Sequence, residues 1–140
     1  MAITQSDVVY TAVATAENGR DGRVATDDGK LDVVVNPPKE QGGSGAGTNP
    51  EQLFAAGYSA CFQGALAVVA RQEGIDIAGS TVTAKVGIGK NDDGFGLIVD
   101  ISAAIPNTDT ATATSLIEKA HQVCPYSKAT RGNITVTLSV

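Results

Sequence analysis

The chain has few of the residue types that mark several large classes of protein. Its 140 residues include two cysteines, one histidine and no tryptophan. Two cysteines do not form the disulfide framework that holds a small secreted domain together. The sequence therefore favours an intracellular protein, in which a cysteine pair is more often catalytic or redox-active.

Positive charge is scarce as well. Lysine and arginine number 10 against 15 aspartates and glutamates, which gives a net charge of -5. The basic residues form no cluster, so neither a nucleic acid nor an anionic membrane surface is expected as a partner. The segment Met1–Asp7 lacks the basic and apolar regions of a signal peptide, and we expect none.

The remaining composition is that of a globular protein. Apolar residues make up 42% of the chain and charged residues 18%, and a chain of this length can bury roughly 70% of its unfolded surface. The sequence contains no internal repeat and no linker. We therefore expect a single domain over residues 1–140.

One long apolar segment dominates the chain. Pro50 suits the first position of a helix and Gly74 suits its end, so we predict a helix from Pro50 to about Gln72. Nearly every side chain of Leu53–Ala70 is apolar or small, which indicates a helix buried on all sides. The run approaches the length of a membrane span, but small and polar residues interrupt it, so we favour a core helix.

The other elements alternate between strands and helices. A second, amphipathic helix starts at Pro106–Asp109 and ends at Pro125. The glycine-rich segment Gln41–Thr48 lacks a phosphate-binding lysine and is interpreted as a connector that lets backbone segments pack closely. Strands are predicted over Val8–Ala16, Arg23–Thr26, Leu31–Val35, Thr81–Ile88, Phe95–Ile105 and Ile134–Val140. This order predicts an α+β fold.

Neither cysteine is activated by its own helix. Cys61 lies in the middle of the apolar helix, where burial raises the pKa of a thiol. Cys124 lies near the negative end of the second helix, which also raises a thiol pKa. Thiol chemistry would therefore need a positive group from elsewhere in the chain. The candidates are His121 and the four arginines, Arg20, Arg23, Arg71 and Arg131, each of which also suits an ordinary structural or surface role.

These residues by themselves leave three functions open. The protein is a thiol peroxidase, a redox sensor that oxidises without turnover, or a hydrophobic-ligand binding protein whose cysteines only pack.

Three motifs carry a resemblance to a known family. The segments NPEQLFAAGYSACF around Cys61, HQVCPYSKATRGNI around Cys124 and GRDGR at Arg20 resemble organic hydroperoxide resistance proteins, the Ohr branch of the OsmC/Ohr family. The Cys-Pro pair favours the Ohr branch over the OsmC branch. Two departures are Asn18, where many relatives carry a glycine, and the polar Gln63.

The resemblance implies a peroxidase that reduces organic, lipid-like hydroperoxides. It implies that Cys61 is the peroxidatic cysteine, that Cys124 resolves its sulfenic acid into a disulfide, and that Arg20 and Glu51 hold Cys61 as a thiolate. The family fold is an intertwined homodimer with antiparallel sheets wrapped around buried central helices. The implied reductant is a lipoylated protein with dihydrolipoamide dehydrogenase, in the cytoplasm, with no bound cofactor or metal.

Two further expectations concern the site. The aromatic residues could line a groove for an organic tail, although a plain core role is favoured for at least two of them; they are Phe54, Tyr58, Phe62 and Tyr126. Glu51 precedes Cys61 by ten positions, or about 15 Å along a straight helix. Either the helix bends near Gly57, or Glu51 serves the Cys61 of a partner subunit.

Overall fold

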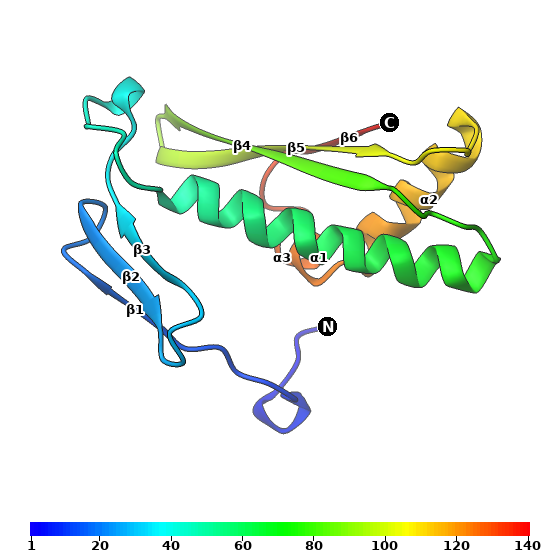
Figure 1. Ribbon diagram of the computed structural model, residues 1–140, viewed down its shortest axis with the longest axis horizontal. Coiled ribbons are helices and arrows are strands. Elements are labelled where there is room, and N and C mark those ends of the chain that lie inside the picture. The colour runs from blue at the N-terminus through cyan, green and yellow to red at the C-terminus, as the bar shows by residue number, and fades with distance from the viewer. The chain divides into compact units, whose positions relative to one another are not determined.

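The structure, a computed structural model, describes all residues from Met1 to Val140. The chain forms two compact units, Met1–Pro50 and Glu51–Val140. Each unit has its own three-stranded sheet, and Figure 1 traces the chain from one to the other.

The sheet of the first unit is an antiparallel meander. It consists of β1 (Ala14–Glu17), β2 (Gly22–Thr26) and β3 (Asp32–Val35) in that order. The predicted strand over Val8–Ala16 was wrong for most of its length, because only Ala14 onward pairs with β2. The β-branched residues before it favour an extended chain, but β2 already turns away after Thr26 and offers them no ladder.

The turn between β1 and β2 has a fixed backbone conformation. Asn18 and Gly19 both take positive φ values, 62° and 58°, a region that glycine adopts freely and asparagine tolerates. This explains how Asn18 can stand where relatives carry glycine. The Asn18 side chain also donates to the Asp21 carbonyl at 2.8 Å, and the Asp21 carboxylate accepts from Asn36. Arg20 therefore stands in a braced turn.

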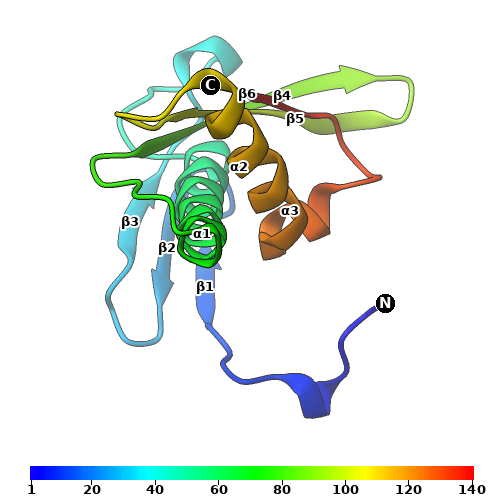
Figure 2. The same cartoon turned by 90° about the vertical axis from the view of Figure 1, so that its right-hand side faces the viewer.

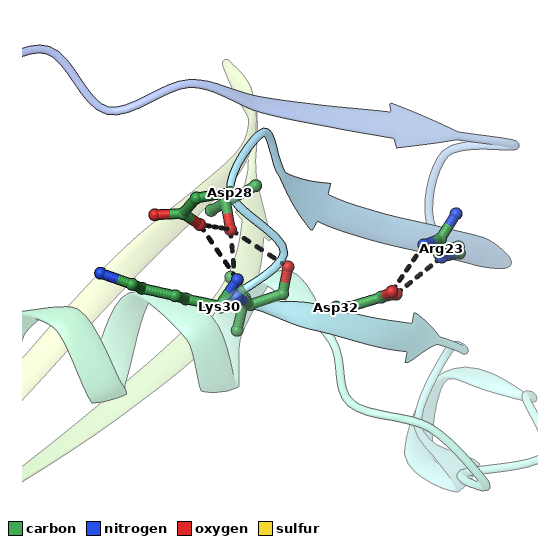
Figure 3. Close-up of polar contacts among 6 residues, drawn as sticks. Arg23, Asp28, Lys30 and Asp32 are labelled. Atoms are coloured by element: carbon green, nitrogen blue, oxygen red, sulfur yellow. Dashed lines mark hydrogen bonds and ion pairs between the residues drawn. The ribbon is translucent and has the colours of Figure 1, made fainter.

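The strands β2 and β3 are joined by an ion pair on their exposed face. Arg23 donates twice to the carboxylate of Asp32, at 2.6 Å each. Figure 3 shows this fork beside the turn in which Asp28 accepts from the Lys30 amide. Because both partners are about half exposed, solvent screens the pair and it contributes little to stability.

The glycine-rich connector folds back on the chain before it. A Cβ atom at Gly43 would lie 2.1 Å from the Pro37 carbonyl oxygen, and one at Gly47 would lie 2.5 Å from that of Val34. The predicted role of the glycines, close packing of backbone, is confirmed.

The second unit combines a long helix, two short ones and a sheet. Its elements are α1 (Pro50–Glu73), β4 (Thr81–Asn91), β5 (Gly94–Ala104), α2 (Thr110–Val123), α3 (Pro125–Thr130) and β6 (Val136–Ser139). The strands β4 and β5 form the expected antiparallel hairpin. The strand β6 pairs with β5 in parallel, so the expectation of antiparallel sheets was wrong here. The helices α2 and α3 provide the crossover that a parallel pair requires.

The helix α1 forms the core with the sheet and α2. Tyr58, Phe62 and Leu66 are fully buried on one of its faces, together with Ile101 of β5 and Leu116 of α2. Figure 2 looks along α1 and shows α2 beside it, with the sheet across both.

The opposite face of α1 is not covered within this chain. Val68 is 39% exposed there, so burial on all sides, as the sequence predicts, is not reached within the single chain. The helix is long and apolar enough to cross a membrane by length and composition alone. Its contacts with β5 and α2, however, are those of a core helix.

An elbow separates α2 from α3. Asp109 caps the start of α2 by accepting from the Thr112 amide at 2.7 Å. The predicted end of this helix before Pro125 is confirmed, because a residue that precedes proline avoids the helical region, and Cys124 has a ψ of 123°. Pro125 then opens α3, a helix that was not predicted, because proline also suits a first helical position.

Candidate functional site

The two cysteines meet where the elbow touches the middle of α1. Their sulfur atoms lie 3.5 Å apart, and both are free thiols. Cys61 is partly exposed, whereas Cys124 is fully buried. A disulfide bond is about 2 Å long, so the sulfurs need to approach by about 1.5 Å to form one. The two thiols are therefore close enough that a small shift would bring the sulfurs to bonding distance.

The second unit by itself does not make Cys61 acidic. Burial raises the pKa of the Cys61 thiol, and the neighbouring Cys124 raises it further. Against these effects, the backbone N–H of Tyr126 donates to Cys61 and lowers the pKa, but the balance stays above the ordinary value. A thiolate at neutral pH therefore requires positive charge beyond what these neighbours provide.

A chain of buried hydroxyl groups lies one helical turn from the sulfurs. The Tyr58 hydroxyl is 2.9 Å from Ser127 Oγ and 3.0 Å from Thr130 Oγ1. Ser127 Oγ is in turn 2.8 Å from His121 Nδ1. A buried hydroxyl left without a partner costs about 1–3 kcal/mol, and no buried side-chain polar atom lacks one here. This network was not predicted from the sequence, because two of its members stand on α3, a helix that was not predicted.

Comparison with known proteins identifies the family. Residues 42–139 match the family described as OsmC-like protein. The chain belongs to the OsmC family. Among curated relatives, the organic hydroperoxide resistance protein of Xanthomonas axonopodis pv. citri (strain 306) is 53% identical over 135 residues, which is 95% of each chain.

Solved structures of OsmC-family proteins agree with this assignment. An organic hydroperoxide resistance protein from Elizabethkingia anophelis, with thiocyanate bound, is 54% identical with a TM-score of 0.90, covering 96% of this chain and 97% of that one. The organic hydroperoxide resistance protein OhrB of Bacillus subtilis is 43% identical with a TM-score of 0.87, covering 94% and 98%. The predicted resemblance to the Ohr branch and the predicted α+β fold are confirmed.

The two charged residues implied by the OsmC-family resemblance stand on different units. Arg20 is in the braced turn of the first unit, and Glu51 is in the first turn of α1. The helix α1 is a single element from Pro50 to Glu73, and its ribbon is continuous (Figure 1). Glu51 thus lies about 15 Å along the helix from Cys61, which disfavours a shared site through a bend. Their roles remain predictions.

The aromatic residues expected to line a groove divide into two pairs. Tyr58 and Phe62 are fully buried, as the core alternative predicts. Phe54 is partly buried and Tyr126 is 39% exposed, and their rings meet edge to face with centroids 6.0 Å apart. A Cβ atom at Gly57 would lie 2.5 Å from the Tyr126 hydroxyl, so the glycine makes room for this ring.

The histidine should make the fold sensitive to mild acid. Burial, and then the Arg131 guanidinium, lower the pKa of His121. The unfolded chain therefore binds this proton more readily than the folded one, and the free energy of unfolding should fall as the pH drops through about 6.5. Urea denaturation between pH 7.5 and 5.5 measures this slope.

The matched control is His121→Asn, which removes the titrating group. Because this is the only histidine of the chain, the variant should show a shallower loss of stability over the same pH range. An equally steep loss in the variant would assign the effect to other groups.

Proposed function

We propose that this protein reduces organic hydroperoxides to alcohols through its two cysteines. The observation that carries the proposal is the 3.5 Å separation of the sulfur atoms of Cys61 and Cys124. It is supported by membership of the OsmC family and by close relatives named for organic hydroperoxide resistance.

The reaction proceeds in three balanced steps. The Cys61 thiolate attacks the distal peroxide oxygen, the O–O bond breaks, and the alkoxide takes a proton to leave as an alcohol, while Cys61 becomes a sulfenic acid. The thiol of Cys124 then displaces the sulfenic hydroxyl as water, and the disulfide forms. An external dithiol reopens the bridge by exchange and is itself oxidised.

Arg20 is the group that we assign to thiolate stabilisation. An arginine is permanently charged and can fork to a carboxylate and a thiolate together. Glu51 would orient it. Glu51 lies about 15 Å along α1 from the Cys61 of its own chain. We therefore place the complete site across a homodimer, in which one chain's Glu51 serves its partner's Cys61.

The exposed face of α1 supports a second copy of the chain as its cover, since a homodimer would bury it. Phe54 and Tyr126 would form the rim of the groove for the organic tail, and the fully buried Tyr58 and Phe62 would lie behind them. The reductant would be a lipoylated protein, recharged by dihydrolipoamide dehydrogenase, in the cytoplasm.

A turnover assay tests the proposal. Reduced protein is mixed with cumene hydroperoxide and excess dihydrolipoamide, and peroxide loss is followed. We expect many equivalents consumed per chain. A redox sensor would consume about one equivalent and stop, and a hydrophobic-ligand binding protein would consume none; either result would reject the peroxidase.

A further inference from the structure

We propose that His121, Ser127, Tyr58 and Thr130 form a positioning network that holds Cys124 in place for attack on the oxidised Cys61. The inference rests on the proposed function, because it concerns the second step of that reaction. It assigns a role to residues other than the two reacting cysteines.

The network and the sulfur pair both connect α1 to the segment around the α2–α3 elbow. On α1, Tyr58 and Cys61 are three residues apart and so share one helix face. On the elbow, Cys124 and Ser127 are also three residues apart. The Tyr58–Ser127 hydrogen bond of 2.9 Å links the two segments at one position, and the two sulfurs face each other at 3.5 Å at the other. The hydrogen bond therefore helps to set the distance between the sulfurs.

The elbow that carries Cys124 is itself fastened across its bend. His121 stands three residues before Cys124 and Ser127 three residues after it, and their side chains are joined at 2.8 Å. Arg131 Nη1 adds a second tie by donating to the His121 carbonyl at 2.9 Å. The backbone of Cys124 at the apex donates to the Ala120 carbonyl at 2.8 Å and accepts from the Lys128 N–H at 3.0 Å, and the two side-chain ties add to this constraint on its direction.

Counting protons gives the network a direction. Four contacts join its members, the fourth being from Thr130 Oγ1 to the Ser127 carbonyl at 3.2 Å. The three hydroxyls supply one proton each, so the fourth must come from His121 Nδ1. The order is then His121 to Ser127, Ser127 to Tyr58, Tyr58 to Thr130, and Thr130 to the carbonyl. Neutral His121 therefore carries its proton on Nδ1.

The network matters for closure of the disulfide and not for the first attack. Cys61 stands on α1, and the contact that lowers its pKa from the elbow side is the backbone N–H of Tyr126, which the hydroxyl and imidazole groups of the network do not supply. The later closure needs the buried Cys124 to approach by about 1.5 Å along one line. A held geometry speeds such an intramolecular step, and a loosened one slows it.

The decisive variant is Thr130→Val, which keeps the shape of the side chain and removes the terminal acceptor. Thr130→Ser retains the hydroxyl and should behave like the parent. Thr135→Val, at an exposed threonine before β6, is the matched control. Thermal unfolding confirms that each variant is folded before kinetics are compared.

Closure is measured with dithiodipyridine, so that the result does not depend on peroxide chemistry. Cys61 attacks this disulfide and releases one thiopyridone; Cys124 then attacks the Cys61 mixed disulfide, loses its proton and releases a second. In Thr130→Val the second release should slow on the order of tenfold, with the first unchanged. A second release within twofold of the parent's would overturn the proposal.

The parent and the three variants are then mixed with cumene hydroperoxide. A parent that closes with dithiodipyridine but ignores the peroxide would reject the proposed function and leave the network standing. If the parent reduces the peroxide and Thr130→Val forms the disulfide at the parent's rate, the proposed function stands and the positioning network is rejected.

Nitrogen-15 NMR gives a second, independent readout. With a single histidine in the chain, the tautomer can be read without assignment. We expect the Nδ1–H form in the parent and in Thr130→Ser. In Thr130→Val the Tyr58 hydroxyl has lost its acceptor and donates to Ser127 instead. Ser127 then donates to His121 Nδ1, so the direction of the hydrogen bonds is reversed and His121 shifts toward the Nε2–H form. An Nε2–H tautomer in the parent would refute the proposed direction and with it the network.

Discussion

Replacing Cys61 by serine is expected to abolish hydroperoxide reduction. A serine hydroxyl is not ionised at neutral pH and does not form the sulfenic acid on which the next step depends. The loss should be roughly a thousandfold or more in rate. The assay follows cumene hydroperoxide in the presence of dihydrolipoamide, with the melting temperature as a check on folding.

Cys124→Ser is the comparison that gives this result its meaning. It removes the buried partner 3.5 Å away but leaves the first attack intact. This variant should consume about one equivalent of peroxide quickly and then hold a sulfenic acid that dimedone traps. If Cys61→Ser retained turnover, or if Cys124→Ser failed to react at all, the assignment of the two roles would be wrong.

Arg20→Ala should slow the first oxidation of Cys61 by roughly a hundredfold. Burial and Cys124 raise the pKa of Cys61, and within the second unit the Tyr126 amide alone counteracts them. Removing the proposed cation should therefore reduce the thiolate fraction at neutral pH. The pH dependence of Cys61 alkylation by iodoacetamide measures the pKa directly, and single-turnover mixing measures the oxidation rate.

Arg23→Ala provides the matched control for Arg20→Ala. Arg23 lies three residues further along, in the exposed pair with Asp32, and its loss should cost little stability and leave the oxidation rate unchanged. If Arg20→Ala and the parent are oxidised at equal rates, Arg20 does not stabilise the Cys61 thiolate. Equal slowing in both arginine variants would indicate a damaged sheet instead.

Much of the fold followed from local patterns. Three features depend on residues adjacent in sequence: the end of α1 beyond Gln72, the hairpin of β4 and β5, and the end of α2 before Pro125. Local preferences also misled, since Val8–Val13 favours a strand yet has no ladder to join. Propensity describes what a segment can adopt, whereas pairing requires a partner at the right register.

The candidate site, like the fold, could be predicted only in part from the sequence. Residues alone showed that neither Cys61 nor Cys124 is activated by its helix, and the family motifs supplied their paired roles. That Tyr58 is fully buried in the core and that its hydroxyl joins a hydrogen-bonded network could not be predicted from sequence. A tyrosine on an apolar helix fits either role until the partner of its hydroxyl is known.

The sequence by itself determined the position of the two long helices and of most strands, which two thiols are available, and to which family the chain belongs, because these depend on neighbouring residues and on motifs. Tertiary structure alone decided that Cys124 faces Cys61, that β6 runs parallel to β5, and that His121, Ser127 and Thr130 close around Tyr58. These contacts join residues as many as 72 positions apart. Such contacts arise only when the buried faces of α1, the sheet and the elbow pack together, and no local pattern encodes that packing.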